Sequence, residues 1–106
     1  MKVYIAGKIS GLPRDEVERL FNEAENFLTS IGYETINPIK IVPPDYPWDI
    51  AMKTLVPYLQ KCDAICLLPN WKNSMGANVE KALAKLYGKQ ILFYKNLRRN
   101  YASPIC

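Results

Sequence analysis

The sequence contains no histidine, and this absence excludes several kinds of chemistry. None of the 106 residues is His, so no mechanism can use an imidazole base and no zinc site can use an imidazole ligand. The three cysteines, Cys62, Cys66 and Cys106, lack the spacing of a metal site. An odd number of cysteines without a disulfide framework is typical of a reducing compartment. We therefore expect a cytoplasmic protein without a metal site.

Long apolar runs and strong charge clusters are also missing. The sequence neither opens with a signal peptide nor carries an apolar run of membrane length, so we expect neither export nor a membrane partner. The formal net charge is only +4, and much of the excess lies in Lys95, Arg98 and Arg99 rather than along one helix face. This distribution does not favour a nucleic-acid polymer as partner. A small anionic ligand fits the charge better.

The length and the alternation of segment types predict one α/β domain. A chain of 106 residues, 49% of them hydrophobic, can build one core but not two. We assign residues 1–106 to a single domain whose tail, 95–106, has no clear pattern. Alternation of strand and helix predicts a Rossmann-like (flavodoxin-like), doubly wound parallel sheet of about four strands with helices on both faces. The expected strands are residues 2–6, 33–36, 64–68 and 90–94.

The helices between these strands are predicted from apolar spacing and from end signals. The first begins at Pro13 and stops at Gly32. Four prolines make residues 37–48 an irregular loop, and long loops often cover binding sites. Asp49 is expected to cap the next helix. Pro57 lies inside this helix and should kink it or shift its start. The last helix should bury its apolar residues Val79, Ala82, Leu83 and Leu86.

The segment from Ser74 to Glu80 predicts a ligand site at a helix start. Ser74 stands where an N-cap belongs, and its hydroxyl lies close to exposed backbone N–H groups. Side chains on a helix lean toward its N-terminus, so Glu80 should lie over Gly76 and Ala77, where little side-chain volume leaves room for a ligand. The alternative is a glutamate that complements the helix dipole and faces water. The position after a strand favours the site.

A second candidate is the loop after the first strand. Its residues Gly7, Lys8, Ser10 and Gly11 offer backbone N–H groups, one hydroxyl and one cation, which suit a phosphate or a sugar hydroxyl. The glycine spacing matches neither a Walker A loop nor a dinucleotide fingerprint. Glycines that only allow a tight turn explain the pattern equally well.

Three aromatic residues are further candidates. Tyr4 lies in the first strand, where a tyrosine usually packs in the core, and its hydroxyl could orient Glu80. Trp48 and Trp71 lie in loops, where an aromatic ring can stack on a flat base or simply anchor the loop to the surface. Both interpretations remain open for the tryptophans.

Three blocks of the sequence together resemble the nucleoside 2-deoxyribosyltransferase superfamily. They are residues 4–11 (YIAGKISG), residues 62–69 (CDAICLLP) and residues 74–80 (SMGANVE). The chain is most similar to a branch of short bacterial and phage proteins, and is also similar to deoxynucleoside 5′-monophosphate N-glycosidases. The resemblance extends to about residue 94 and is more specific for fold than for activity.

The resemblance implies a covalent glycosyl mechanism without a cofactor. Glu80 would attack C1′ of a deoxynucleoside or its monophosphate and expel the base, while Tyr4 would hold the carboxylate. Ser10, Gly11 and Ser74 would bind the 5′-phosphate or 5′-hydroxyl. An unperturbed glutamate has a pKa of about 4.3, so we expect an ionised nucleophile at neutral pH.

The sequence departs from this pattern at two positions. The enzymes carry an acid about two turns before the position of Asp63, where this chain has Leu55. The nearest acid is Asp49, which is therefore a candidate for substrate binding. The N-glycosidases carry an arginine at the position of Ser10, where only nearby Lys8 brings positive charge.

From these features we expect a hydrolase or transferase that cleaves or exchanges the base of a deoxynucleoside or deoxynucleotide. The alternative is a non-catalytic nucleotide-binding or sensing module with a degenerate site. Either protein would bind a small nucleoside or nucleotide. Because the superfamily enzymes assemble, we also expect a homo-oligomer, dimer or larger, in which a neighbour completes the pocket.

Overall fold

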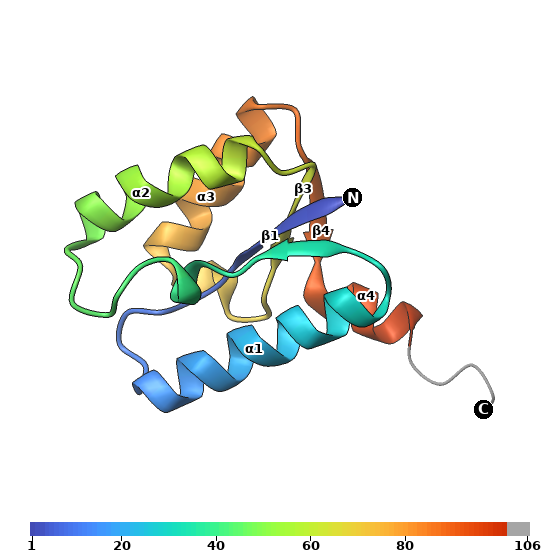
Figure 1. Cartoon of the computed structure of the whole chain (residues 1–106), viewed down its shortest axis with the longest axis horizontal. Helices are drawn as coiled ribbons and strands as arrows, with labels where there is room; N and C mark the ends of the chain where they lie inside the picture. Colours follow the sequence, from blue (N-terminus) through green and yellow to red (C-terminus); the bar gives the residue numbers. More distant parts are fainter. Residues whose placement is uncertain (102–106) are drawn as a thin grey trace.

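The computed structural model describes residues 1–101, which form a parallel sheet with helices on both faces (Figure 1). The Rossmann-like α/β fold predicted from the sequence is confirmed. No helix among residues 1–101 combines the length and the apolar character needed to span a membrane. The strands are β1 (Lys2–Ala6), β2 (Glu34–Ile36), β3 (Ala64–Leu67) and β4 (Gln90–Phe93), and the helices are α1 (Arg14–Ser30), α2 (Trp48–Gln60), α3 (Met75–Leu86) and α4 (Tyr94–Asn100).

The order of the strands decides which loops meet. The sheet runs β2-β1-β3-β4, and every neighbouring pair is parallel. β1 and β3 lie side by side, with Tyr4 opposite Ile65. The loops that follow them therefore leave the sheet at the same edge, where the strand order reverses and open α/β folds bind ligands. Asn70 joins the two loops, because its side-chain oxygen accepts a hydrogen bond from the backbone N–H of Lys8 at 2.9 Å.

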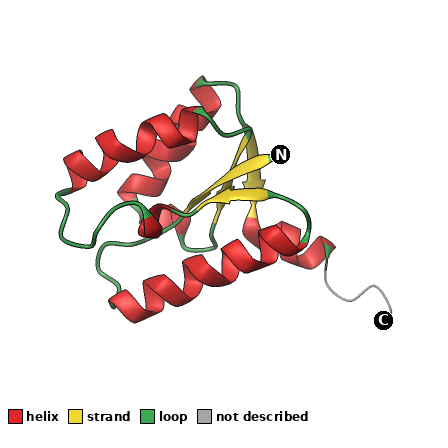
Figure 2. Ribbon diagram, viewed as in Figure 1, coloured by secondary structure: helices red, strands yellow, loops and turns green. Residues whose placement is uncertain are grey.

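Helices lie on both faces of the sheet (Figure 2). The core therefore has two layers, because side chains alternate between the faces along each strand. On one face, Val3 and Ile5 of β1 pack with the buried side of α1. On the other face, Tyr4 and Ala6 pack with residues of α2 and α3. Every residue of β1 after Lys2 is buried, which explains the continuous apolar run in the sequence.

The proline-rich segment and the tail contain more regular structure than expected. Pro38–Lys40 forms a short 3₁₀ turn (η1), and α2 begins at Trp48, with Pro47 rather than Asp49 in the N-cap position. Pro57 does not shift the start of α2, since the helix begins at Trp48 and continues through the proline to Gln60. Buried Leu55 and Leu59 on either side of the proline hold this part of the helix against the sheet. Beyond residue 94, α4 forms a further helix, while residues 102–106, with Cys106, lie outside the described residues.

The face of α3 that packs on the sheet differs from the expected one. The buried residues are Ala77, Glu80 and Ala84, whereas Ala82 is exposed and Leu86 is 76% exposed. The small side chains of Ala77 and Ala84 let this face of the helix approach the sheet closely. Glu80 lies on the same face and is therefore buried. The prediction that Val79, Ala82, Leu83 and Leu86 form the buried face is therefore wrong for Ala82 and Leu86, and Val79 and Leu83 are only partly buried.

Candidate functional site

A buried carboxylate and a buried hydroxyl meet at the centre of the site. Glu80 lies in the second turn of α3 and is 6% exposed, and Tyr4 in the middle of β1 is fully buried. The Tyr4 hydroxyl donates a short hydrogen bond to Oε2 of Glu80. The contact forms because α3 packs on the same face of the sheet as the Tyr4 side chain. Two residues 76 positions apart in the sequence thus form one unit.

Burial changes the protonation of this pair. It raises the pKa of Glu80 to about 7, although the hydrogen bond from Tyr4 acts in the opposite direction. Burial, followed by the neighbouring Glu80 charge, raises the pKa of Tyr4 well above 10. Tyr4 therefore remains a hydrogen-bond donor, and Glu80 changes its charge near neutral pH. The expectation of a fully ionised glutamate at neutral pH needs correction, because it used the value of a solvated side chain.

The start of α3 is held by the two side chains of Ser74 and Asn78. The hydroxyl oxygen of Ser74 accepts a hydrogen bond from the backbone N–H of Ala77 at 3.1 Å, which confirms the predicted N-cap. The Asn78 amide donates to the carbonyl oxygens of Trp71, Lys72 and Ser74 at 3.2, 3.2 and 2.8 Å. The helix start beside Glu80 is therefore rigidly connected to the loop that follows β3.

A cavity of about 520 Å³ opens beside Glu80. Its walls are the loop after β1, the proline-rich segment before α2, and the first turns of α2 and α3. Among the described residues that line it, Glu80 is the only one with a carboxylate. A volume of this size is typical of a site for a small organic molecule.

Only some of the candidate residues in the loop after β1 line the cavity. Gly7, Lys8 and Ser10 line it, whereas Gly11 does not. Gly11 has a φ of +85°, so it serves the turn rather than the cavity wall. A Cβ atom on Gly7 would lie 2.7 Å from Cδ1 of Leu68, which shows that close backbone packing also requires a glycine there.

A cation that the sequence interpretation missed lies in the same wall. Arg14, in the first turn of α1, lines the cavity together with Lys8. Its Nη2 donates to the carbonyl oxygen of Ile39 at 3.3 Å, and its Nε lies 3.2 Å from Oε2 of Glu18. Its position at the start of a helix after β1 could have indicated a place in the cavity wall. The sequence pattern, however, equally predicts an i,i+4 ion pair between Arg14 and Glu18.

The two tryptophans have different positions. Trp48 lines the cavity, and a Cβ atom on Gly76 would lie 3.4 Å from its Nε1 atom. Gly76, itself a lining residue, therefore leaves space between the indole and α3. Trp71 does not line this cavity. It packs instead on Phe93 of β4, with ring centroids 6.1 Å apart, and under the ammonium group of Lys81.

The part of the cavity wall formed by α2 lacks the acid that the resemblance implies. Asp49 lies exposed in the first turn of α2 and is not among the lining residues. Its carboxylate is placed to complement the helix dipole. Leu55, one and a half turns further along α2, lines the cavity and is 5% exposed. This wall is therefore apolar.

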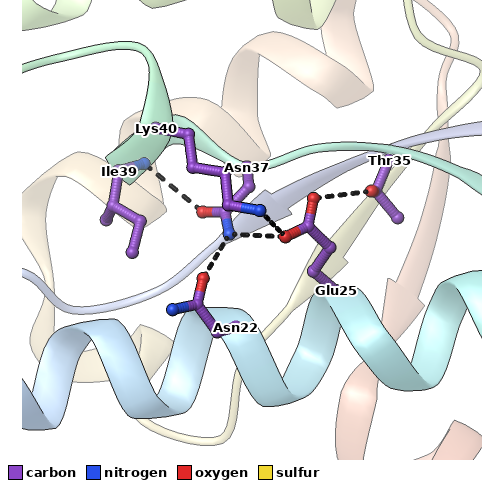
Figure 3. Close-up of polar contacts among 6 residues, drawn as sticks. All are labelled: Asn22, Glu25, Thr35, Asn37, Ile39 and Lys40. Atoms are coloured by element: carbon purple, nitrogen blue, oxygen red, sulfur yellow. Dashed lines mark hydrogen bonds and ion pairs between the residues drawn. The ribbon is translucent and has the colours of Figure 1, made fainter.

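A polar network fixes the beginning of the proline-rich segment (Figure 3). Asn37 is 4% exposed, and its amide nitrogen donates to Asn22 and Glu25 of α1 at 3.2 and 3.4 Å. Its side-chain oxygen accepts from the backbone N–H of Ile39. Lys40 forms an ion pair with Glu25. None of these residues was a candidate in the sequence, because their partners become visible only in the fold.

The described residues provide neither a metal site nor a reactive thiol. Among residues 1–101, no group of three or more Cys, Asp or Glu comes together in a way that could hold a metal ion. Cys62 and Cys66 are free and buried. Burial raises the pKa of Cys62 to about 11 and that of Cys66 to about 12, so both are protonated thiols within the core.

Comparison with known proteins identifies a family and a structural neighbour. Residues 1–93 match the family described as "Domain of unknown function (DUF4406)". No curated protein matches the sequence. Among solved structures, the CMP N-glycosidase BcmB of Clostridium botulinum superposes with a TM-score of 0.61 at 19% sequence identity. The match covers 88% of this chain and 67% of the glycosidase, and it shows a shared fold.

Proposed function

We propose that this chain, which belongs to the DUF4406 family, cleaves or exchanges the N-glycosidic bond of a nucleoside 5′-monophosphate. The observation that carries the proposal is the buried Glu80, which accepts a hydrogen bond from Tyr4 and borders a cavity of about 520 Å³. A carboxylate kept from water and fixed by a tyrosine is suited to nucleophilic attack. The fold shared with a CMP N-glycosidase supports the same class of reaction.

In the proposed reaction, a carboxylate oxygen of Glu80 forms a bond to C1′ as the bond from C1′ to the base nitrogen breaks. The bonding electron pair leaves with the base, which then takes up a proton from water. A water molecule next attacks C1′ of the glycosyl ester, which releases the sugar phosphate and the Glu80 carboxylate and gives up one proton. If a nitrogen of a second base attacks in place of water, the result is transfer instead of hydrolysis.

Two cations in the cavity wall support an anionic substrate. Lys8 and Arg14 line the cavity, and both lie near the N-terminus of α1, whose dipole also favours negative charge. The apolar wall that includes Leu55 would contact the base. A substrate with a phosphate at one end and a flat base at the other matches this division.

The first experiment incubates the protein with ribo- and deoxyribonucleoside monophosphates, with and without a second free base, and separates the products by chromatography. Base release or exchange should rise with pH through about 7, as Glu80 loses its proton. Glu80→Gln should lower the rate at least about 1,000-fold, as the loss of a covalent nucleophile does. Unchanged turnover in Glu80→Gln would rule out the mechanism.

A second candidate is a nucleotide-binding module without turnover. The observation that favours it is Leu55, which lines the α2 wall of the cavity. The described lining residues therefore include no acid besides Glu80 that could protonate the departing base. This candidate predicts that nucleotides bind and that base release is absent in the same assay. Calorimetric titration alongside chromatography separates the two candidates.

A further inference from the structure

The cavity offers no carboxylic acid to a departing base. Glu80 is the only carboxylate among the lining residues that the structure describes, and the proposed reaction uses it as the nucleophile. The other hydrogen-bonding side chains of the lining carry hydroxyl, amide, indole, ammonium or guanidinium groups. Each of these groups is a weaker acid than a carboxyl group. A neutral base must therefore leave as an anion or obtain a proton from water.

An aromatic ring lies about one helical turn from Glu80. A Cβ atom on Gly76 would lie 3.4 Å from Nε1 of Trp48. Gly76 and Glu80 are on the same side of α3, because residues i and i+4 of a helix lie above one another. Both residues and Trp48 line the cavity, and Tyr46 adds a second ring to the wall. An aromatic face attracts a cation as well as a flat ring.

The positive charges of the wall come from the other layer of the molecule. Arg14 begins α1, and Lys8 precedes it in the loop after β1, whereas Trp48 begins α2. α1 and α2 cover opposite faces of the sheet (Figure 1). Within the described part of the chain, α2 and α3 contribute no cation to the lining. A phosphate near Lys8 and Arg14 therefore leaves the α2 and α3 side of the cavity free for a second positive charge.

We propose that the base of the substrate is itself a cation, so that the substrate is a nucleoside 5′-monophosphate with a positively charged ring bonded to C1′. Pyridinium and N7-alkylpurine nucleotides share this chemistry. The substrate class rests on the proposed function and specifies it for the same site. A cationic base needs no acid, because the electron pair of the broken bond neutralises its ring. The absence of a second carboxyl group among the described lining residues then no longer prevents turnover.

With such a base, the reaction balances without a proton for the leaving group. In nicotinamide mononucleotide, a carboxylate oxygen of Glu80 bonds to C1′ as the bond from C1′ to the pyridinium nitrogen breaks. The electron pair stays on that nitrogen, and neutral nicotinamide leaves. Water then attacks C1′ of the ester, which releases ribose 5-phosphate and the carboxylate and gives up one proton.

A positive ring also suits the buried carboxylate. Glu80 is 6% exposed, and burial raises its pKa to about 7 because the ionised form is poorly solvated there. A cation in the cavity favours the ionised form, and this form is the nucleophile. The Trp48 ring attracts the same cation. Charge and aromatic contact therefore both select a cationic base over a neutral one of the same shape.

The first test compares kcat/KM for cationic and neutral nucleotides. N7-methyl-GMP and GMP form a matched pair that differs by one methyl group and one charge, and nicotinamide mononucleotide is compared with CMP. Rates measured without protein are subtracted. We expect the neutral nucleotides to react about 100-fold or more slowly, which is the usual contribution of the missing general acid.

The outcomes separate this substrate class from the proposed function. Base release from GMP or CMP at a rate within about tenfold of the cationic nucleotides would overturn the substrate class and leave the proposed function standing. The absence of base release from all four nucleotides would overturn both. Cleavage of only one cationic nucleotide supports the substrate class and tells whether the base is a pyridinium or an N7-alkylpurine.

The second test measures recognition of the charge apart from the chemistry. Carbocyclic nicotinamide mononucleotide, in which a methylene group replaces the ring oxygen, resists cleavage, and its dihydro form has a neutral ring. The cationic form should bind about tenfold or more tightly than the neutral form in calorimetric titration, and Trp48→Leu should reduce this ratio about threefold or more. Equal affinity of the two forms, or an unchanged ratio in Trp48→Leu, would contradict recognition of the charge.

Tyr58→Leu is the matched control for this test. Tyr58 also lies on α2 and is 39% exposed, compared with 47% for Trp48, but it does not line the cavity. Its replacement should leave the affinity ratio unchanged. Circular dichroism verifies that both variants are folded.

Discussion

At the scale of single residues, the burial of Glu80 both forms the site and raises the pKa of the carboxyl group in it. Glu80 is held between α3 and β1, and the loss of water raises its pKa to about 7. Tyr4 partly offsets this effect by donating a hydrogen bond to the carboxylate. A site of this kind lowers the stability of the fold at the pH at which its carboxylate is ionised.

Glu80→Gln should reveal this cost. The folded-state pKa of Glu80 lies above its unfolded value of about 4.3, so the wild type loses stability as pH rises from about 4 to about 7 and not beyond. The full loss is of the order of 3 kcal/mol. Glutamine stays neutral and can still accept the Tyr4 hydrogen bond, so the variant should lack this fall. Urea denaturation at pH 5 and pH 8 measures the difference, and equal pH dependence in both proteins would contradict it.

Gly7→Ala should destabilise the protein by about 1–3 kcal/mol, the usual cost of overpacking a core. The added methyl group would lie 2.7–3.0 Å from three side-chain atoms of Leu68, which is itself 2% exposed. Ser10→Ala, in the same loop but exposed, is the matched control and should change stability by less than about 0.5 kcal/mol. Thermal denaturation of both variants tests the expectation, and a Gly7→Ala protein as stable as the control would show that Leu68 can move aside.

At the scale of elements, the segment between β2 and α2 depends on the side chain of Asn37 for its position. This buried amide connects α1 to the 3₁₀ turn that begins the wall of the cavity (Figure 3). Its partner Glu25 also accepts a hydrogen bond from Thr35. Partial burial raises the pKa of Glu25, but the hydrogen bonds from Lys40, Asn37 and Thr35 and the Lys40 charge outweigh it and lower the pKa. This contribution to stability is therefore lost only in acid.

Asn37→Ala should destabilise the fold by about 1–3 kcal/mol, because it leaves buried polar groups without partners. The backbone N–H groups of Lys40, Ile41 and Val42 donate to the carbonyl oxygens of residues 37 and 38, and their hydrogen exchange should accelerate more than exchange in β1. Asn26→Ala, on the exposed surface of α1, is the control. Equal protection of the three amides in wild type and Asn37→Ala would show that the prolines alone hold the segment.

At the scale of the whole molecule, the strand order creates the site. β1 and β3 are neighbours, so the loop with Lys8 and the helix with Glu80 come from distant parts of the sequence and border one cavity. Helix α1 adds Arg14 from the opposite layer. The cavity is therefore a property of the assembled sheet and both of its helical layers.

Ligand binding to this cavity should stabilise the entire fold. A nucleoside monophosphate at about 100 times its dissociation constant should raise the free energy of unfolding by about 2.7 kcal/mol. Arg14→Gln should weaken the monophosphate about tenfold or more and change the matching nucleoside little, because it removes a charge-assisted contact to phosphate. Arg19→Gln is the matched control, since Arg19 forms the same i,i+4 pair, with Glu23 at 3.2 Å. Equal shifts in melting temperature for Arg14→Gln and wild type would exclude the phosphate role of Arg14.

The sequence by itself determined the order of strands and helices, the N-cap at Ser74 and the pairing of a carboxylate with a glycine loop at one sheet edge. These features depend on local propensity, on apolar periodicity and on the rule that parallel strands end together, all of which operate over short stretches of chain. For the same reason the predicted strand boundaries differ from the observed ones by no more than one residue.

The tertiary structure alone decided the rest. Which face of α3 is buried depended on how closely Ala77 and Ala84 approach the sheet, and an apolar pattern on both sides of the helix left that choice open. The same packing set the pKa of Glu80, turned Trp71 toward β4 and left Met75 and Leu86 exposed. Each of these outcomes depends on contacts between residues far apart in the chain, which no local pattern encodes.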